Sequence, residues 1–160
     1  MSDLSSWLDS MCNTFGFGEP KKAEAGGMAK VADEAQAAAS DHRLENLTPE
    51  ACKDGMPGQN PYDPDASRSR AGLKDRARAM KPRMDAITRK VHRLIEAGET
   101  ERGRPKDPTL LAVYNEQIDV GARVANLYHR IDSYEQSEAE NRLITAELRL
   151  NALECKVAAL

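Results

Sequence analysis

The sequence has few aromatic residues, and this scarcity excludes a packed β-sheet core. Only 7 of its 160 residues are aromatic, namely one Trp, four Tyr and two Phe. Cores made of strands depend on aromatic and β-branched side chains, whereas the Ala, Leu, Glu, Lys and Arg that dominate this chain are good helix formers. The composition therefore predicts an all-α protein with narrow apolar seams in place of a wide core.

Long apolar runs and a secretory signal are also missing. No stretch approaches the roughly 18 to 20 apolar residues of a membrane-spanning helix, and the first residues lack a basic segment followed by an apolar one. We therefore expect a protein of the cytoplasm or of a virion that is not secreted and has no transmembrane segment. Cys12, Cys52 and Cys155 are an odd number of cysteines at wide spacings, which predicts free thiols in a reducing compartment.

No motif with the geometry of catalysis is present. The sequence lacks a Gly-rich phosphate loop, His-Glu-x-x-His, Cys-x-x-Cys and Gly-x-Ser-x-Gly. Residues 63–67 read Asp-x-Asp-x-Ser, like the start of a calcium loop, but Arg68 and Lys74 stand where that loop needs glycine and glutamate. The sequence predicts no enzyme, no cofactor and no metal site.

The N-terminal part of the chain is predicted to be an extended arm with short helices. Residues 1–19 form a short amphipathic anchor that binds a partner or folds back on the body, with a membrane surface as the alternative. Residues 20–65 hold an alanine-rich helix at 28–40 and then a Pro/Gly-rich arm, in which Thr48 and Pro49 can open a single helical turn. The apolar face of the anchor consists of Leu4, Trp7, Leu8, Met11 and Phe15.

Heptad spacing predicts that residues 66–160 form a long antiparallel helical hairpin with coiled-coil seams. The first helix, residues 66–97, keeps its phase across Pro82. The second, residues 109–159, follows a loop rich in Gly and Pro. The seam of the first helix is Leu73, Ala77, Met80, Met84, Ile87, Val91 and Leu94, and that of the second is Leu110, Val113, Gln117, Val120, Val124, Leu127, Ile131 and Tyr134.

A third seam begins beyond Tyr134, where the heptad phase slips by one residue. At 1.5 Å per residue the first helix would be about 48 Å long and the second about 76 Å. The first helix would then cover the second only to about residue 140. The third seam is predicted to overhang the hairpin and to bind another chain, unless residues 28–40 cover it. Its partner-binding residues are Leu143, Leu150, Leu153, Val157 and Leu160.

The net charge of −3 hides a basic middle third. Residues 1–67 carry 5 basic and 12 acidic side chains, residues 68–107 carry 13 and 6, and residues 108–160 carry 5 and 8. A basic helix can bind nucleic acid without sequence specificity, but it can equally pair with acidic residues of its own chain or of a neighbour. The candidate polyanion-binding residues are Arg68, Arg70, Lys74, Arg76, Arg78, Lys81 and Arg83.

This layout of apolar anchor, proline-rich arm and helical hairpin resembles that of small helical structural proteins of bacteriophage particles, including internal and head–tail components. The resemblance implies a homo-oligomer or multi-copy assembly in which arms wrap neighbours and helices bundle. We therefore predict a structural or assembly protein, a virion component, that acts through protein partners. The alternatives are a non-specific nucleic-acid-associated protein that uses the basic helix, and an intracellular coiled-coil adaptor.

Overall fold

The structure is a computed structural model that describes residues 26–53 and 69–160, with side chains from residue 30 onward. Of the described residues, 84% are helical and 3% are in strands, which confirms the all-α prediction. The elements in chain order are α2 (Gly26–Glu45), α3 (Pro49–Cys52), α4 (Arg70–Ala97), β1 (Thr100–Glu101), β2 (Arg104–Pro105), α5 (Pro108–Arg130), the 3-10 turn η1 (Ile131–Ser133) and α6 (Gln136–Ala158).

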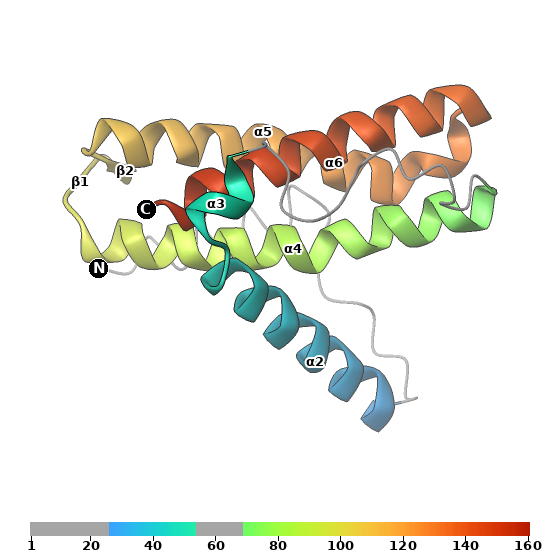
Figure 1. The fold of residues 1–160 in the computed structure, drawn as a ribbon, viewed down its shortest axis with the longest axis horizontal. Helices are drawn as coiled ribbons and strands as arrows, with labels where there is room; N and C mark the ends of the chain where they lie inside the picture. The colour runs from blue at the N-terminus through green and yellow to red at the C-terminus, as the bar shows by residue number, and fades with distance from the viewer. Residues whose placement is uncertain (1–25, 54–68) are drawn as a thin grey trace.

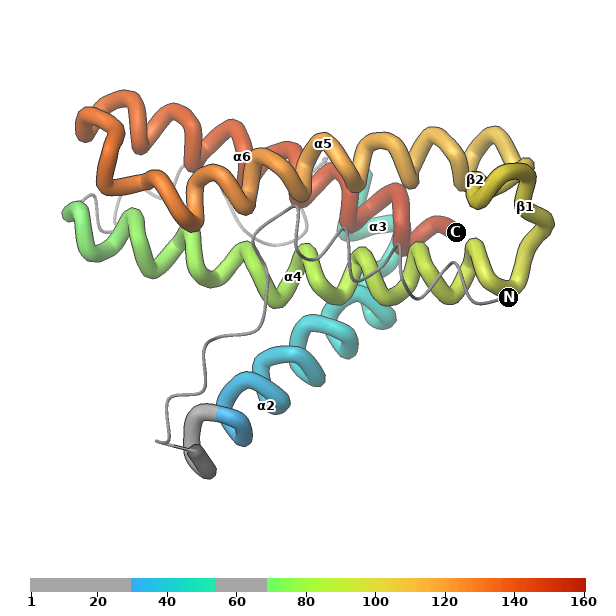
Figure 2. The backbone as a smooth tube through the Cα atoms, turned by 180° about the vertical axis from the view of Figure 1, so that it is seen from behind, coloured from blue at the N-terminus to red at the C-terminus, as the bar shows by residue number. Residues whose placement is uncertain are grey.

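Three long helices, α4, α5 and α6, pack side by side as a bundle (Figure 1). Helices α4 and α5 form the predicted antiparallel hairpin. The chain then turns back, so that α6 runs parallel to α4 (Figure 2). Helix α2 lies outside the bundle and crosses α4 at a steep angle, and α3 lies beside the C-terminal part of α6.

Local sequence signals account for the helix ends. The Ser69 hydroxyl accepts a hydrogen bond from the Gly72 amide at 3.1 Å, and the Asp107 carboxylate accepts one from the Leu110 amide at 2.7 Å. These side chains satisfy amides that the first helical turn leaves unpaired. The predicted single turn at Thr48 is also present, because its hydroxyl accepts a hydrogen bond from the amide of Ala51.

Helix α4 continues through Pro82 and ends at Gly98. The loop that follows forms a minimal hairpin, in which Thr100 pairs with Pro105 and Glu101 with Arg104. Its tip has left-handed backbone at Arg102 (φ 51°) and Gly103 (φ 76°). The prediction of an all-α protein therefore holds for the described residues, apart from this two-stranded hairpin of four residues.

The first two predicted seams form the core between α4 and α5. Every predicted seam residue is buried except Leu94 and Tyr134, which are partly buried and pack against the core. Ile95 occupies the buried position that was predicted for Leu94. The polar seam residue Gln117 is also buried, and its side-chain amide donates to the hydroxyl of Thr88 at 3.0 Å. A single buried polar pair of this kind favours one register of the two helices.

The prediction of one continuous helix over residues 109–159 was wrong. Helix α5 ends at Arg130, the 3-10 turn follows, and α6 begins at Gln136. Arg70 of α4 stabilises this turn, because its guanidinium donates to the carbonyl oxygens of Ile131 at 3.0 Å and Tyr134 at 2.9 Å. These are carbonyls of the kind that a helix end leaves without an intrahelical partner.

The predicted overhang was wrong for the same reason. Leu143, Leu150, Leu153 and Val157 have exposed fractions of 0% and belong to one core cluster with residues of α4 and α5. Each large aliphatic side chain contributes roughly 1.5 to 3 kcal/mol when it is fully buried. Folding back provides this stabilisation within the chain, and of the predicted seam only Leu160 remains exposed.

The prediction that all three cysteines are free thiols was also wrong. Cys52 of α3 and Cys155 of α6 form a disulfide, with their Cα atoms 5.7 Å apart. Their separation of 103 residues gave no sign of this pairing, because only the return of α6 along the bundle places Cys155 beside α3. Cys12 lies outside the described residues.

We predict that Leu150→Ala lowers the free energy of unfolding by about 3 kcal/mol, because it removes a fully buried side chain from the core. Leu148→Ala is the matched control, since Leu148 lies on the same helix and is 38% exposed. Urea unfolding followed by circular dichroism measures both variants. Equal destabilisation by the two changes would contradict the burial of the third seam inside the chain.

Candidate partner-binding surfaces

Of the ten predicted partner-binding residues, four are buried in the core and five lie outside the described residues. The five apolar residues of the N-terminal anchor lie outside the described residues. The C-terminal seam lies in the core, apart from Leu160 at 40% exposed. A partner-binding surface among the described residues must therefore lie elsewhere.

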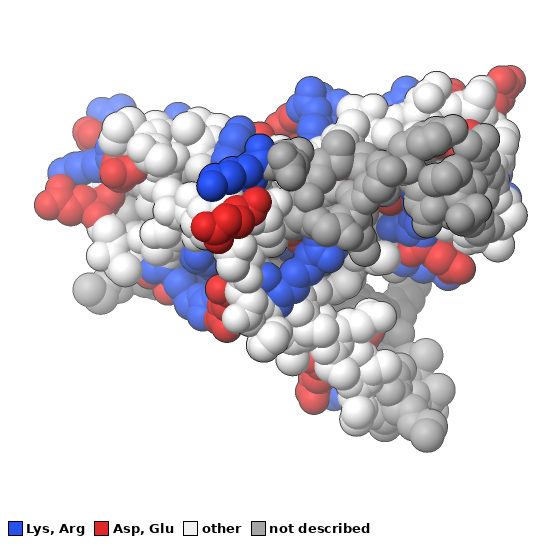
Figure 3. All heavy atoms as spheres, viewed as in Figure 1, with Lys and Arg blue, Asp and Glu red and all other residues white. Residues whose placement is uncertain are grey.

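The candidate polyanion-binding residues that the structure describes have partners within the chain. Arg68 lies outside the described residues, and the six other candidates all contact acceptors of this chain. On the face shown in Figure 3, basic and acidic side chains lie next to one another. The contacts are Arg70 with the carbonyls of Ile131 and Tyr134, Lys74 with Asp132, Arg76 with Glu147, Arg78 with Asp75, Lys81 with Asp85, and Arg83 with Glu154.

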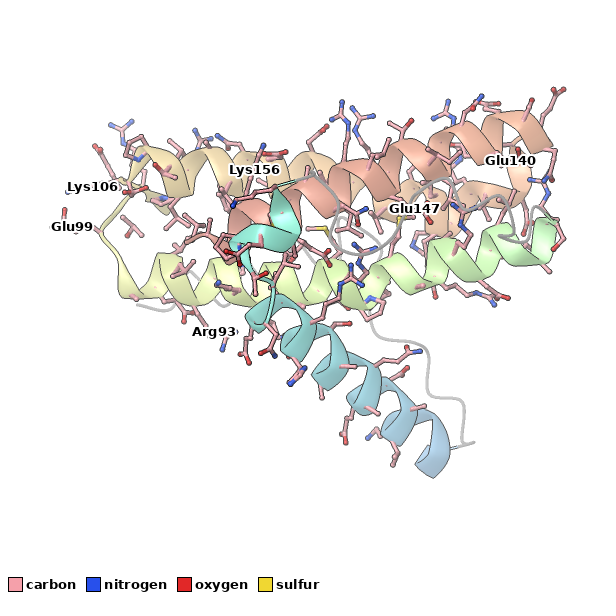
Figure 4. The ribbon with its side chains drawn as sticks, in the orientation of Figure 1. Arg93, Glu99, Lys106, Glu140, Glu147 and Lys156 are labelled. Atoms are coloured by element: carbon pink, nitrogen blue, oxygen red, sulfur yellow. A yellow bond between two sulfur atoms is a disulfide. The ribbon has the colours of Figure 1, made fainter. Side chains whose placement is uncertain are left out.

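Two of these ion pairs form a ladder between the parallel helices α4 and α6. Arg76 binds both carboxylate oxygens of Glu147, at 3.0 and 2.6 Å (Figure 4). One heptad further along each helix, Arg83 binds Glu154 in the same way, at 2.8 and 2.6 Å. Sequence analysis missed this ladder, although the matching seven-residue spacings on both helices were visible.

The ladder is partly buried and ties three helices together. The Glu154 side chain is 4% exposed and that of Arg83 is 13% exposed. Arg83 also donates to the side-chain oxygen of Asn151, and Arg43 of α2 lies 3.5 Å from the Glu154 carboxylate. Buried charges are tolerated only when they are paired and hydrogen-bonded. This cluster therefore acts as a structural contact between α2, α4 and α6.

A cleft of about 400 Å³, lined by both polar and apolar side chains, lies between α5 and α6. Its charged groups are already engaged. Asp119 binds Arg123 at 3.1 Å and Arg149 at 2.8 Å, while Arg142 pairs with a glutamate one turn earlier and lies 4.5 Å from the ring centroid of Tyr134. The cleft therefore presents no unpaired charge to a ligand. Its lining residues are Asp119, Ala122, Arg123, Asn126, Leu127, Tyr134, Asn141, Arg142, Thr145 and Ala146.

The remaining titratable groups do not gather into a site. His42, His92 and His129 lie on α2, α4 and α5 respectively. Burial lowers the pKa of His92, and the nearby charge of Glu96 opposes that shift. Within residues 26–53 and 69–160, no group of three His, Cys, Asp or Glu side chains could hold a metal ion. No helix in the same ranges has the length and apolarity needed to cross a membrane.

The first half of α2 stands away from the bundle (Figures 1 and 2). Residues 30–36 are all exposed, and Val31 is 65% exposed. The contacts that hold α2 come from its end, where Leu44 is buried and Asp41 pairs with Arg89 at 3.0 Å. The structure thus presents about two free turns of an alanine-rich helix, which sequence analysis could not distinguish from a helix packed on the body.

No protein-family model, no curated protein sequence and no solved structure matches this chain.

We predict that Arg83→Gln lowers the free energy of unfolding by about 2 to 3 kcal/mol, because it leaves the buried Glu154 carboxylate without its main partner. Arg93→Gln is the matched control, since Arg93 is exposed on the same helix and forms no ion pair within the described ranges. Chemical unfolding of both variants provides the comparison. If Arg93→Gln is as destabilising as Arg83→Gln, the pairing of Arg83 with Glu154 does not contribute to stability.

We also predict that the intact protein does not bind duplex DNA, because the six candidate basic residues of α4 have partners within the chain. Fluorescence anisotropy of a labelled duplex at low salt tests this expectation. Binding that weakens as salt rises and is reduced by Arg76→Gln would contradict it.

Proposed function

We propose that the protein is a structural component of a multi-copy assembly, which it joins through its N-terminal region while α4, α5 and α6 form a self-contained body. One observation carries this proposal, namely the exposed first half of α2. A helix that projects from a folded bundle without covering it adds nothing to the core of that bundle. Its exposed turns are available to a neighbouring chain.

A neighbouring helix would also stabilise the projecting part of α2. Short helices are only marginally stable in water without tertiary contacts. Alanine favours the helix, but it offers little apolar surface, and the first turn of α2 has no acidic residue to complement the helix dipole. A partner helix packed over Val31 and the adjacent alanines would supply the missing burial.

The predicted anchor supports the same conclusion from the sequence. Residues 1–19 are separated from α2 by residues 20–25, and their apolar spacing is that of a short amphipathic helix. Anchor and projecting helix therefore lie close in the sequence and together are suited to binding other proteins. The layout resembles that of bacteriophage structural proteins, so we propose a virion as the assembly.

The C-terminal seam no longer supports this function, because Leu143, Leu150 and Leu153 are buried inside the chain. Nucleic-acid binding through α4 is not proposed, since its six candidate residues have internal partners. The proposal depends on the N-terminal region.

We predict that the wild-type chain self-associates with rising concentration and that Val31→Glu weakens this association by about tenfold or more, since a charge at a buried contact costs over 1 kcal/mol. Multi-angle light scattering after gel filtration measures the molar mass. Leu148→Glu is the control, because Leu148 is an exposed apolar residue on α6. A wild-type chain that stays monomeric at every concentration, or association that depends on Leu148 and not on Val31, would count against the proposal.

A further inference from the structure

Helix α3 has little noncovalent attachment to the bundle. It has four residues, none of them buried, and it is stabilised locally by its Thr48 cap. Glu50 and Ala51 are exposed. The bond between Cys52 and Cys155 is its covalent link to α6.

The segment that leads into α3 has no firm anchor of its own either. The contacts that hold α2 end at Leu44, which is buried. From Asn46 to Lys53 the hydrogen bonds are local: Asn46 binds the carbonyl of His42, Ala51 binds Thr48, and Lys53 binds the carbonyl of Glu50. The disulfide is thus the strongest link between residues 46–53 and the body of the protein.

Both cysteines are only half-buried. The core does not depend on the disulfide. The buried apolar cluster consists of residues of α4, α5, the 3-10 turn and α6 together with Leu44, and it contains no residue of α3. Opening the disulfide therefore removes a tether without uncovering the main core.

We propose that the Cys52–Cys155 disulfide is a redox-sensitive latch that holds α3 against α6 when closed and releases residues 46–53 when reduced, while the bundle stays folded. Opening needs a thiol reductant, for example a dithiol. One thiolate of the dithiol attacks a cysteine sulfur, and the displaced sulfur leaves as a thiolate that takes up a proton. The second thiol of the reagent then breaks the mixed disulfide, which yields two cysteine thiols and one cyclic disulfide of the oxidised reagent.

Closure is the reverse exchange with a low-molecular-weight disulfide, which accepts the two electrons. The latch concerns the redox state of this chain alone, so it does not depend on the proposed assembly function. If both hold, the redox state sets whether the segment after α2 is fixed on the bundle or free to reach a neighbour.

Mapping of the linked peptides tests whether the latch closes. The full-length chain is equilibrated in a buffer of reduced and oxidised glutathione, quenched with acid, alkylated after denaturation and digested, and mass spectrometry identifies the disulfide-linked peptides. The latch predicts a Cys52–Cys155 linked pair in the wild type and in Cys12→Ser, which is lost after reduction with a dithiol. A wild type in which Cys52 and Cys155 are only alkylated or carry glutathione would overturn the proposal.

Hydrogen exchange tests what the latch holds. The amides of Ala51 and Lys53, which are hydrogen-bonded within this turn, should exchange about tenfold or more slowly in the oxidised wild type and in oxidised Cys12→Ser than in the dithiol-reduced proteins, because a released single turn loses its protection. Cys155→Ser should exchange fast in both conditions. Amides in the middle of α4 and α5 are the internal control and should not change.

Two results of the exchange measurement would contradict the latch. If exchange at Ala51 and Lys53 does not respond to reduction, the disulfide does not control α3. If reduction exposes α4 and α5 as well, the bond stabilises the whole fold and is not a local latch.

Discussion

Burial of one apolar stripe determines the arrangement of the whole chain. The stripe runs along α6 from Ala139 to Val157, and it is buried in the same core cluster as residues of α4 and α5. Without α6, the paired helices α4 and α5 would leave part of their own seams exposed, since two helices cannot enclose a core. The turn after Arg130, the ion-pair ladder and the position of Cys155 all follow from this third helix lying parallel to α4.

Periodicity determined much of the fold from the sequence. The seams of α4 and α5 were predicted almost residue by residue, because a heptad pattern reports which side of a helix is buried regardless of what covers it. The same pattern could not report where a helix ends. The phase slip after Tyr134 and the polar residues that follow it were visible, but they are equally consistent with a long helix that changes its packing partner.

Contacts between distant segments were the part that sequence analysis could not supply. Nothing in the spacing of Cys52 and Cys155 indicated their pairing, because their distance depends on the path of α6. The basic run on α4 had two open interpretations, nucleic acid or internal acidic partners, and the positions of Glu147 and Glu154 on a returning helix favour the second. The exposure of the first half of α2 could not be predicted for a related reason, because alanine occurs on both buried and exposed helix faces.

The disulfide also gives the chain a mechanical property. It closes residues 52–155 into a covalent ring that contains α4, α5 and most of α6. A pull on the two chain ends would act first on the contacts that hold α2 on α4, such as that of Asp41 with Arg89. Beyond them the force would pass through the sulfur atoms to the end of α6, so the chain inside the ring, with the hairpin of α4 and α5, could not be extended while the protein is oxidised.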